Sequence, residues 1–246
     1  MQTILFADLD DTLFATERKQ GKTTNCQLAS TLSDGSPSGY CNQKQQDFFQ
    51  LWWQNALIIP VTARSVNAYQ RVLLPFNSYA IVNHGGTILL PNGACDPDWQ
   101  QQVRAYHSET QDWLMRQLAV FQQIAHKQAC DIRHSIQKEG DMPLYLLIKH
   151  NQNDAQALAE LVQTYRRQQA PQEWQEATLH LNDNNFALLP HWLGKANAVT
   201  YLMDKLKAQY GDCLTIGCGD SQSDLAFMRC CDYWITPTHS QIDRSL

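Results

Sequence analysis

The sequence lacks any apolar run approaching the ~20 residues that a membrane-spanning helix needs. Its first apolar stretch reaches the acidic Asp8 within a few residues, which is too short for the apolar region of a secretory signal peptide. We therefore expect a soluble, cytoplasmic protein that has no membrane partner.

An excess of positive charge is also missing. The chain has 19 Lys and Arg residues against 24 Asp and Glu residues, which gives a formal net charge of −5. Nucleic acids and anionic membranes attract basic surfaces, so neither is an expected partner. If the substrate is an anion, a local cation or a positively lined pocket must overcome this negative field.

The eight cysteines contain no C-x-x-C pair, and their spacing is irregular. A disulfide framework is typical of short exported chains, and this chain shows no export signal. We therefore expect free thiols in a reducing compartment.

Five short apolar runs predict buried parallel strands, because they are rich in branched residues and do not alternate strictly with polar ones. These runs are residues 3–7, 57–62, 79–83, 213–217 and 233–236. Helical patterns lie between several of them, which favours an α/β fold with a doubly wound parallel sheet. In such sheets, ligands bind at the carboxyl ends of the strands.

The middle of the chain follows a different order of helix, two strands, helix and two strands. The expected elements are residues 98–127, 131–137, 144–149, 154–167, 178–181 and 186–189. Short polar turns between neighbouring strands indicate an antiparallel sheet backed by helices. We therefore expect an inserted α+β domain at residues 89–190 and a core domain formed by residues 1–88 and 191–246.

Residues 15–46 form a polar stretch rich in Ser, Thr, Gly, Gln and Asn. It follows the first strand directly, so it lies at the edge of the sheet where ligands bind. Two interpretations stay open: a mobile surface insertion, or a loop that contacts the substrate or the inserted domain.

The first strand ends in two acids, Asp8 and Asp10. Where the strand ends and the chain turns, both side chains can face one pocket. At ~4 Å and an effective dielectric near 20, two such charges repel by about 4 kcal/mol. A cation, or protonation of one acid, must offset this repulsion.

The fourth strand ends in a glycine-rich turn that carries Asp220 and Asp224. Because the carboxyl ends of parallel strands lie on one edge, these acids can meet Asp8 and Asp10 there. Oxygen ligands without a His or Cys cluster favour a hard cation, and Mg²⁺ is the default for phosphate chemistry.

Groups that can bind an anion follow two other elements. The second strand ends in Thr62, and its hydroxyl and the amides at the start of a helix can cradle an oxyanion. Lys195 precedes the helix that leads into the fourth strand. There it can balance the carboxylates and bind a phosphoryl oxygen.

Together these stations resemble the four motifs of the haloacid dehalogenase (HAD) superfamily, in order and over nearly the whole chain. They are D-L-D-D-T at residues 8–12, V-T-A-R at 61–64, G-K-A-N-A at 194–198 and G-D-S-Q-S-D at 219–224. The inserted domain and the N-H-G-G-T-I segment at 83–88 resemble the Cof-like and sucrose-phosphate phosphatase branch. The resemblance implies a HAD Rossmann-like core with an α/β cap.

The resemblance also implies roles for individual residues. Asp8 would attack phosphorus and form an aspartyl-phosphate, and Asp10 would act as general acid and then as general base. The implied phosphoryl-binding residues are Thr62, Ala63, Arg64 and Lys195, although an arginine at a helix start is more often a surface residue. The implied Mg²⁺ ligands are Asp8, the backbone carbonyl of Asp10, Asp220 and Asp224, the last either as a ligand or as a carboxylate behind the ligands.

The expected function is therefore hydrolysis of a small phosphorylated metabolite, a sugar phosphate by resemblance. A sugar phosphomutase of the same fold and a non-catalytic sugar-phosphate-binding regulatory protein are the alternatives. The second acid, Asp10, argues against dehalogenation, because members that cleave carbon–halogen bonds lack it. Two departures from the family pattern are Asp11 and Ala63, each of which replaces a usual glycine.

Overall fold

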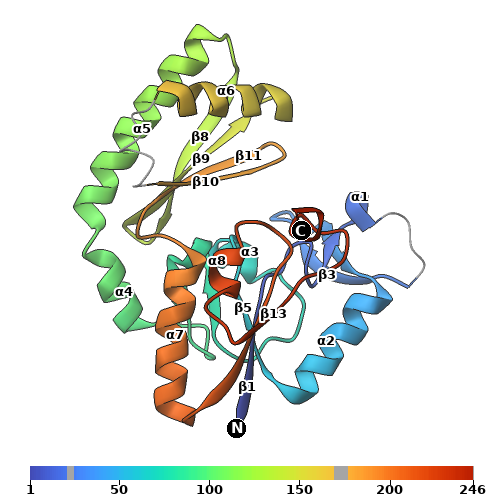
Figure 1. Ribbon diagram of the computed structural model, residues 1–246. Helices are drawn as coiled ribbons and strands as arrows, with labels where there is room; N and C mark the ends of the chain where they lie inside the picture. Colours follow the sequence, from blue (N-terminus) through green and yellow to red (C-terminus); the bar gives the residue numbers. More distant parts are fainter. Residues whose placement is uncertain (21–24, 169–176, 246) are drawn as a thin grey trace. The chain divides into compact units, whose positions relative to one another are not determined.

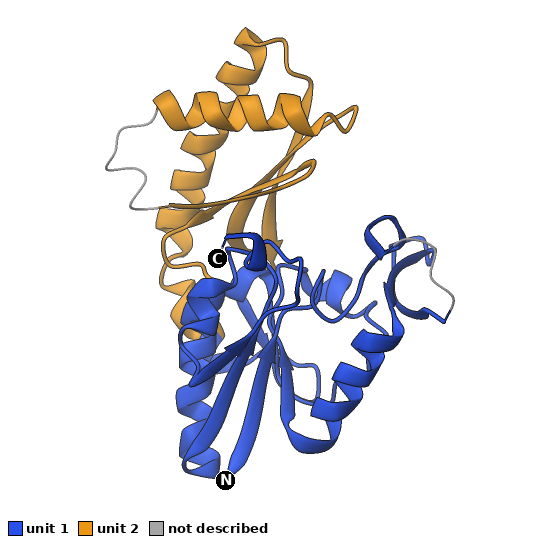
Figure 2. Cartoon of the chain, turned by 45° about the vertical axis from the view of Figure 1, so that its right-hand side comes forward, with its two compact units in different colours: residues 1–99, 195–246 blue, residues 100–194 orange. Residues whose placement is uncertain are grey.

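The computed structural model describes residues 1–20, 25–168 and 177–245, and the chain divides into two compact units. The core unit is Met1–Trp99 with Lys195–Leu246, and the inserted unit is Gln100–Gly194 (Figure 2). The first boundary lies 11 residues beyond the predicted one, and the second lies four residues beyond it. The first does so because the Trp99 indole donates to the Gly85 carbonyl at 3.0 Å, which ties this residue to the core unit.

A parallel four-stranded sheet forms the centre of the core unit, in the order β13-β12-β1-β5 (Figure 1). The strands are β1 (Gln2–Ala7), β5 (Leu57–Pro60), β12 (Cys213–Cys218) and β13 (Tyr233–Ile235). The last four of the six residues of β1 are buried, as expected of a strand covered on both faces. The predicted α/β class with a parallel sheet is confirmed.

Helices lie on both faces of this sheet. On one face, Phe49 of α2 (Gln43–Asn55) packs in the same cluster as Leu5 and Ala7 of β1. On the other, α8 (Leu225–Met228) lies so close to β12 that a Cβ on Gly217 would stand 2.7 Å from the Met228 Cα. This unit also contains α3 (Val66–Tyr69), α7 (Lys195–Tyr210) and the short 3-10 turn η3 (Asp243–Ser245).

A short hairpin continues from β5. Strand β6 (Ala80–Val82) bridges to Val61 in parallel through Ile81, and pairs antiparallel with β7 (Thr87–Leu89). Between them, Asn83, His84 and Gly85 of η1 (Asn83–Gly85) have positive φ angles of 54°, 56° and 96°. This tight left-handed turn is the N-H-G part of the segment that resembles the Cof-like branch.

The described part of residues 15–46 forms a small antiparallel sheet in the order β2-β4-β3. Its elements are β2 (Ala15–Thr16), α1 (Glu17–Gln20), β3 (Gln27–Thr31) and β4 (Pro37–Cys41). The Cys41 thiol lies 3.3 Å from the Leu13 carbonyl, and the Gln45 amide donates to the Thr12 carbonyl at 3.3 Å. These contacts hold the small sheet against the loop that follows β1.

The inserted unit has the predicted element order. Helix α4 (Pro97–Arg104) leads into it, followed by α5 (His107–Lys127), β8 (Ile132–Glu139), β9 (Met142–His150), α6 (Ala155–Gln168), β10 (Ala177–Asn182) and β11 (Asn185–Pro190). The single helix predicted at 98–127 is two helices, because the chain turns at residues 105–106.

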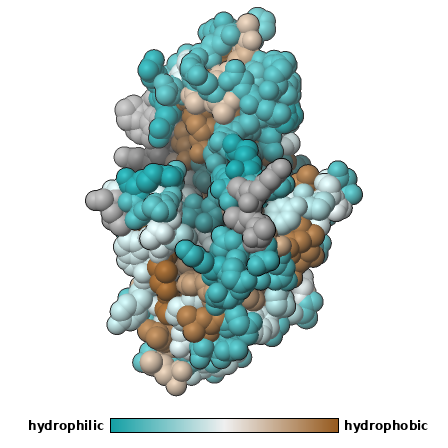
Figure 3. Space-filling view, turned by 90° about the vertical axis from the view of Figure 1, so that its right-hand side faces the viewer, coloured by the Kyte–Doolittle hydropathy of each residue, from teal (hydrophilic) through white to brown (hydrophobic). Residues whose placement is uncertain are grey.

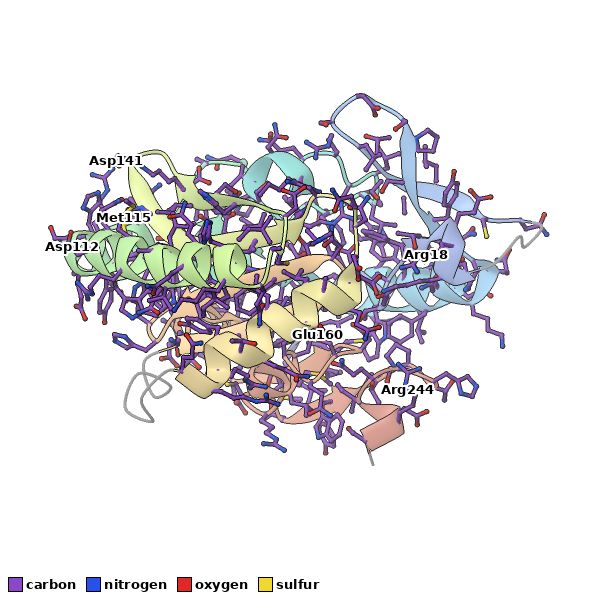
Figure 4. All side chains as sticks on the ribbon, turned by 90° about the horizontal axis from the view of Figure 1, so that it is seen from above. Arg18, Asp112, Met115, Asp141, Glu160 and Arg244 are labelled. Atoms are coloured by element: carbon purple, nitrogen blue, oxygen red, sulfur yellow. The ribbon has the colours of Figure 1, made fainter. Side chains whose placement is uncertain are left out.

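An antiparallel sheet in the order β10-β11-β9-β8 carries the core of the inserted unit. Its even-numbered side chains on β9 and β11 pack against α5 and α6, with Phe121 and Tyr165 stacked at 4.0 Å between ring centroids. The opposite side of α5 carries exposed Asp112 and Met115, and that of α6 carries exposed Glu160, all three labelled in Figure 4.

The surface and the cysteines are those of an ordinary globular protein. Hydrophilic residues predominate on the face shown in Figure 3, and hydrophobic atoms gather there in separate groups. All eight cysteines are free, as expected. None of the described helices combines the length and the apolar character needed to cross a membrane.

Candidate active site

The expected site residues follow strands whose ends lie side by side. The Asp8 N–H donates to the Cys218 carbonyl at 2.8 Å, which joins the end of β1 to that of β12. The Val61 N–H donates to the Ala7 carbonyl at 2.8 Å, which joins β1 to the residues after β5. Three strand ends therefore present Asp8, Thr62 and Asp220 on one edge of the sheet.

Three of the four predicted acids meet there. Asp8, Asp220 and Asp224 each have a carboxylate oxygen within 4.8 Å of those of the other two. Asp8 is 6% exposed and Asp224 only 1%, whereas Asp220 is half-buried. Thr12 links two of them, since its hydroxyl lies 3.5 Å from Asp8 Oδ2 and 3.4 Å from Asp220 Oδ1.

Lys195, the first residue of α7, is the cation of this cluster. Its Nζ donates to Asp8 Oδ1 at 2.6 Å and to Asp224 Oδ1 at 2.7 Å. The ammonium also lies 5.6 Å from the centre of the Phe227 ring, a distance at which the ring face attracts a cation. One lysine thus bridges two buried carboxylates.

Burial and crowding perturb the acids in different directions. Burial raises the pKa of Asp8 well above its usual range despite Lys195, and Asp224 adds to the rise. Burial, with Asp224 and Asp11 nearby, raises the pKa of Asp220 to about 7. The pKa of Asp224 is lowered, because Lys195 and the hydrogen bonds from Ser221 outweigh its burial. The cluster contains three acids and one lysine, so its positive charge does not balance three carboxylates.

The donor set fits a hard divalent cation. Every candidate ligand is an oxygen, and no His or Cys belongs to the acidic cluster found among the described residues. Mg²⁺ prefers such ligands and commonly takes one or two carboxylates together with substrate phosphate. A cation of this kind would supply the positive charge that the cluster lacks.

Asp10 takes a different position from the other acids. Its carboxylate is not part of the cluster and instead accepts two hydrogen bonds from Arg64, from Nε to Oδ2 and from Nη2 to Oδ1, both at 2.7 Å. The structure therefore pairs two predicted site residues with each other. Sequence patterns carried no signal for this pairing, because it depends on side-chain direction.

The residues after β5 present a hydroxyl and an amide. Thr62 is 1% exposed, and its Oγ1 accepts from the Arg64 N–H at 3.1 Å. The Thr62 N–H donates to the Ile81 carbonyl, whereas no partner is recorded for the Ala63 N–H in the described part of the chain. After β5, the Thr62 hydroxyl and the Ala63 N–H can therefore donate hydrogen bonds to an anion.

Two further residues belong to the site by contact. Thr12, the last letter of the D-L-D-D-T motif, stands between two acids, and Ser221 donates to Asp224 Oδ2 from its N–H at 3.0 Å and its hydroxyl at 2.6 Å. Motif membership was the signal for both, but their partners could not be read from the sequence.

The departure at Asp11 has a structural counterpart. Its φ of 64° lies in the left-handed region that glycine adopts readily, and Asp is among the side chains that tolerate it. Lys19 of α1 forms an ion pair with its carboxylate. This ion pair links α1 to the loop that follows β1.

A parallel α/β core with an inserted α+β unit, and acids at the ends of two adjacent strands, is the arrangement expected of a HAD-type phosphatase. A family model described as "Sucrose-6F-phosphate phosphohydrolase" matches residues 1–233, nearly the whole chain. The protein belongs to this family of HAD phosphatases. A search of curated protein sequences gave no match.

Solved structures with the same fold have low sequence identity to this chain. A sucrose-phosphatase from Synechocystis, in complex with sucrose and phosphate, has a TM-score of 0.50 and 18% identity over 93% of this chain and 79% of that one. The C-terminal domain of C. albicans trehalose-6-phosphate phosphatase has a TM-score of 0.55 and 12% identity over 93% and 73%. A haloacid dehalogenase-like hydrolase from Bacteroides thetaiotaomicron has a TM-score of 0.50 and 12% identity over 96% of this chain and 94% of that one. These similarities establish the shared fold.

Proposed function

We propose that the protein is a magnesium-dependent phosphomonoester hydrolase that acts on a small sugar phosphate through an aspartyl-phosphate on Asp8. The observation that carries the proposal is the position of the Asp8 carboxylate. It is buried, bonded to Lys195 at 2.6 Å, and grouped with Asp220 and Asp224 within 4.8 Å.

In the first half of the reaction, a carboxylate oxygen of Asp8 attacks phosphorus. The bond from phosphorus to the leaving oxygen breaks, and Asp10 gives that oxygen a proton. The Lys195 ammonium and the donors of Thr62 and Ala63 bind the remaining phosphoryl oxygens. The products are the free sugar and an aspartyl-phosphate.

In the second half, water attacks the phosphorus of the aspartyl-phosphate and gives a proton to Asp10. The bond between phosphorus and Asp8 breaks, so inorganic phosphate leaves and the Asp8 carboxylate is restored. The proton from water replaces the one that Asp10 gave to the leaving oxygen in the first half.

Asp8 and Asp220, with the backbone carbonyl of Asp10, are the proposed magnesium ligands. Mg²⁺, when bound, offsets the negative charge that the phosphoryl group adds to the acids. Both oxygens of Asp224 already accept hydrogen bonds, from Lys195 and from Ser221. We therefore propose that Asp224 positions Lys195 and is not itself a direct ligand of the metal.

The family supports a sugar phosphate as the substrate, since its model is named for sucrose 6F-phosphate. Two solved relatives by fold are named for sucrose phosphate and trehalose 6-phosphate. We propose that the inserted unit acts as the cap that selects among such sugars. We also propose a cytoplasmic location, which fits eight free cysteines.

The test is release of inorganic phosphate from a panel containing sucrose 6F-phosphate, trehalose 6-phosphate, hexose 6-phosphates and p-nitrophenyl phosphate. We expect turnover with MgCl₂, none with EDTA, and loss of at least ~10³-fold in Asp8→Asn, as is usual when a nucleophile is removed. The exposed Asp212 offers a matched control, because Asp212→Asn makes the same change away from the site. Full activity of Asp8→Asn would refute the proposal, and movement of phosphate within one sugar without its release would indicate a mutase.

A further inference from the structure

We propose that Arg64 is a positioning residue for Asp10: its guanidinium fixes the direction of the carboxyl group that protonates the leaving oxygen. This inference deepens the proposed function and rests on it. It gives Arg64 a different part in the reaction from the phosphoryl binding that the sequence implies.

The contact between the two side chains has the geometry of a specific pair. Arg64 Nε and Nη2 each donate to a different oxygen of Asp10 at 2.7 Å, across 54 residues of sequence. Such a planar fork fixes the orientation of a carboxylate, which a single ammonium cannot do. The Nε–H and the Nη2–H that bond Asp10 are not available to a phosphoryl group at the same time.

Arg64 itself is held firmly. Its guanidinium carbon lies 5.1 Å from the centre of the Phe14 ring, and Phe14 is fully buried. The Arg64 N–H donates to Thr62 Oγ1 at 3.1 Å, and the Arg64 carbonyl accepts from the Asn83 N–H at 2.7 Å. The Phe14 ring therefore fixes the guanidinium of Arg64, and Thr62 and Asn83 fix its backbone.

Among the described residues, Arg64 is the side chain that holds the Asp10 carboxylate. The Asp10 side chain is 49% exposed, against 18% for that of Arg64. Because the Asp10 carboxylate is half-exposed, solvent screens this ion pair and limits its contribution to folding stability, even with the bidentate geometry. Proton transfer, in contrast, depends steeply on where the acid is placed. The pair is thus suited to orient the acid more than to stabilise the fold.

A series of aryl phosphates tests the inference without knowledge of the natural sugar. The leaving group of the 2,4-dinitrophenyl ester departs as a stable phenolate and needs no proton. The leaving group of the 4-methoxyphenyl ester is far more basic and needs a proton from the general acid. In Arg64→Met we expect kcat/KM to fall about twofold for the first ester and about thirtyfold or more for the second, which is part of the ~10²–10⁴-fold that general acid catalysis contributes. Asp10→Asn should show the same trend, and the double variant should be no worse than Asp10→Asn.

Arg64→Lys keeps the charge but loses the fork, so it should fall between the wild type and Arg64→Met. The exposed Arg116 on α5 gives a matched control, Arg116→Met, which should leave the whole series unchanged. A melting curve for each variant establishes that it is folded.

Two results would overturn the inference. An equal loss for every ester, with weaker inhibition by inorganic phosphate, would make Arg64 a phosphoryl ligand. An unchanged series in both Arg64 variants would make the pair a surface contact without a role. If the wild type hydrolyses none of the esters, or Asp8→Asn hydrolyses them as well as the wild type does, the proposed function itself fails, which is a distinct outcome.

Discussion

The Nζ atom of Lys195 lies 2.6 Å from Oδ1 of Asp8, although 187 residues separate them. Asp8 follows the central strand β1, and Lys195 begins the helix that returns to the core unit after the insertion. The same ammonium reaches Asp224 at 2.7 Å. The candidate site therefore exists only when both parts of the core unit are folded together.

The first prediction concerns Mg²⁺ and Asp220. MgCl₂ should raise the melting temperature of the wild type, since a ligand at 100 times its Kd stabilises by about 2.7 kcal/mol. In Asp220→Asn this rise should be lost or much smaller, because one carboxylate of the cluster is gone. Without Mg²⁺, the variant should be at least as stable as the wild type, since it has less repulsion between acids.

Differential scanning calorimetry with and without MgCl₂ measures both effects, with Asp212→Asn as the control. An undiminished response in Asp220→Asn would remove this residue from the cation site.

The second prediction concerns Gly219. A Cβ at this position would stand 2.6 Å from the Asp224 Cβ and 2.9 Å from its Cγ. Gly219→Ala should therefore displace Asp224 and, through it, Lys195. We expect kcat to fall about tenfold or more, since a shift of ~1 Å in an active site can cost ~10²-fold.

Steady-state kinetics on p-nitrophenyl phosphate would show this loss. Gly194→Ala is the matched control, because a Cβ there meets nothing within 4 Å. If Gly219→Ala is as active as the wild type, the placement of Asp224 does not matter.

The third prediction concerns Asp96 and stability in acid. Asp96 is fully buried, which by itself raises its pKa. Bonds from Lys205 at 2.7 Å and from the Trp99 N–H outweigh this, so its pKa is lowered. A lowered folded-state pKa contributes stability above the unfolded value of about 3.9, and this is lost as pH falls through the folded value.

Asp96→Asn should therefore lower the free energy of unfolding at pH 7 by about 1–3 kcal/mol. The difference in unfolding free energy between the variant and the wild type should shrink as the pH falls from about 5 to 2. At position 96, only the wild type has a negative charge to lose in that range. Urea unfolding at several pH values measures this. A pH-independent difference would show that the charge of Asp96 is not what stabilises the fold.

The fourth prediction concerns the left-handed Asp11, with φ of 64°. Asp11→Gly loses an exposed ion pair with Lys19 but relieves backbone strain, so we expect a change within about 1 kcal/mol and nearly full activity. Asp11→Val cannot adopt this φ easily and should cost about 1–3 kcal/mol. Denaturant unfolding compares the two, and an Asp11→Val protein as stable as the wild type would contradict the strain.

Much of the fold could be predicted because its signals are local and strong. Four of the five apolar runs form the parallel sheet, although the edge strand β13 exposes Tyr233 and Trp234. The fifth run, at β6, instead pairs antiparallel with β7 and joins the sheet through one parallel bridge to Val61. The shared edge of the parallel strands correctly predicts that Asp8 lies near Asp220. The small sheet within residues 15–46 could not be predicted, because its short strands carry few large apolar side chains. The turn at residues 105–106 was missed because neither Gly nor Pro marks it.

Side-chain direction sets the limit for the site. The sequence placed Asp8 and Asp10 two residues apart and allowed both to face one pocket. In the structure, Asp8 bonds to Lys195 whereas Asp10 bonds to Arg64. The choice depends on partners 54 and 187 residues away, which no local pattern records.

The most direct test of the account is to identify the residue that carries the phosphoryl group during turnover. The enzyme is quenched in acid while it hydrolyses substrate in MgCl₂, reduced with borohydride, and its peptides are analysed by mass spectrometry. An aspartyl-phosphate is reduced to homoserine, which we predict at position 8 in the wild type and nowhere in Asp8→Asn. Rapid turnover with position 8 recovered only as aspartate, or with homoserine at another position, would contradict the central claim.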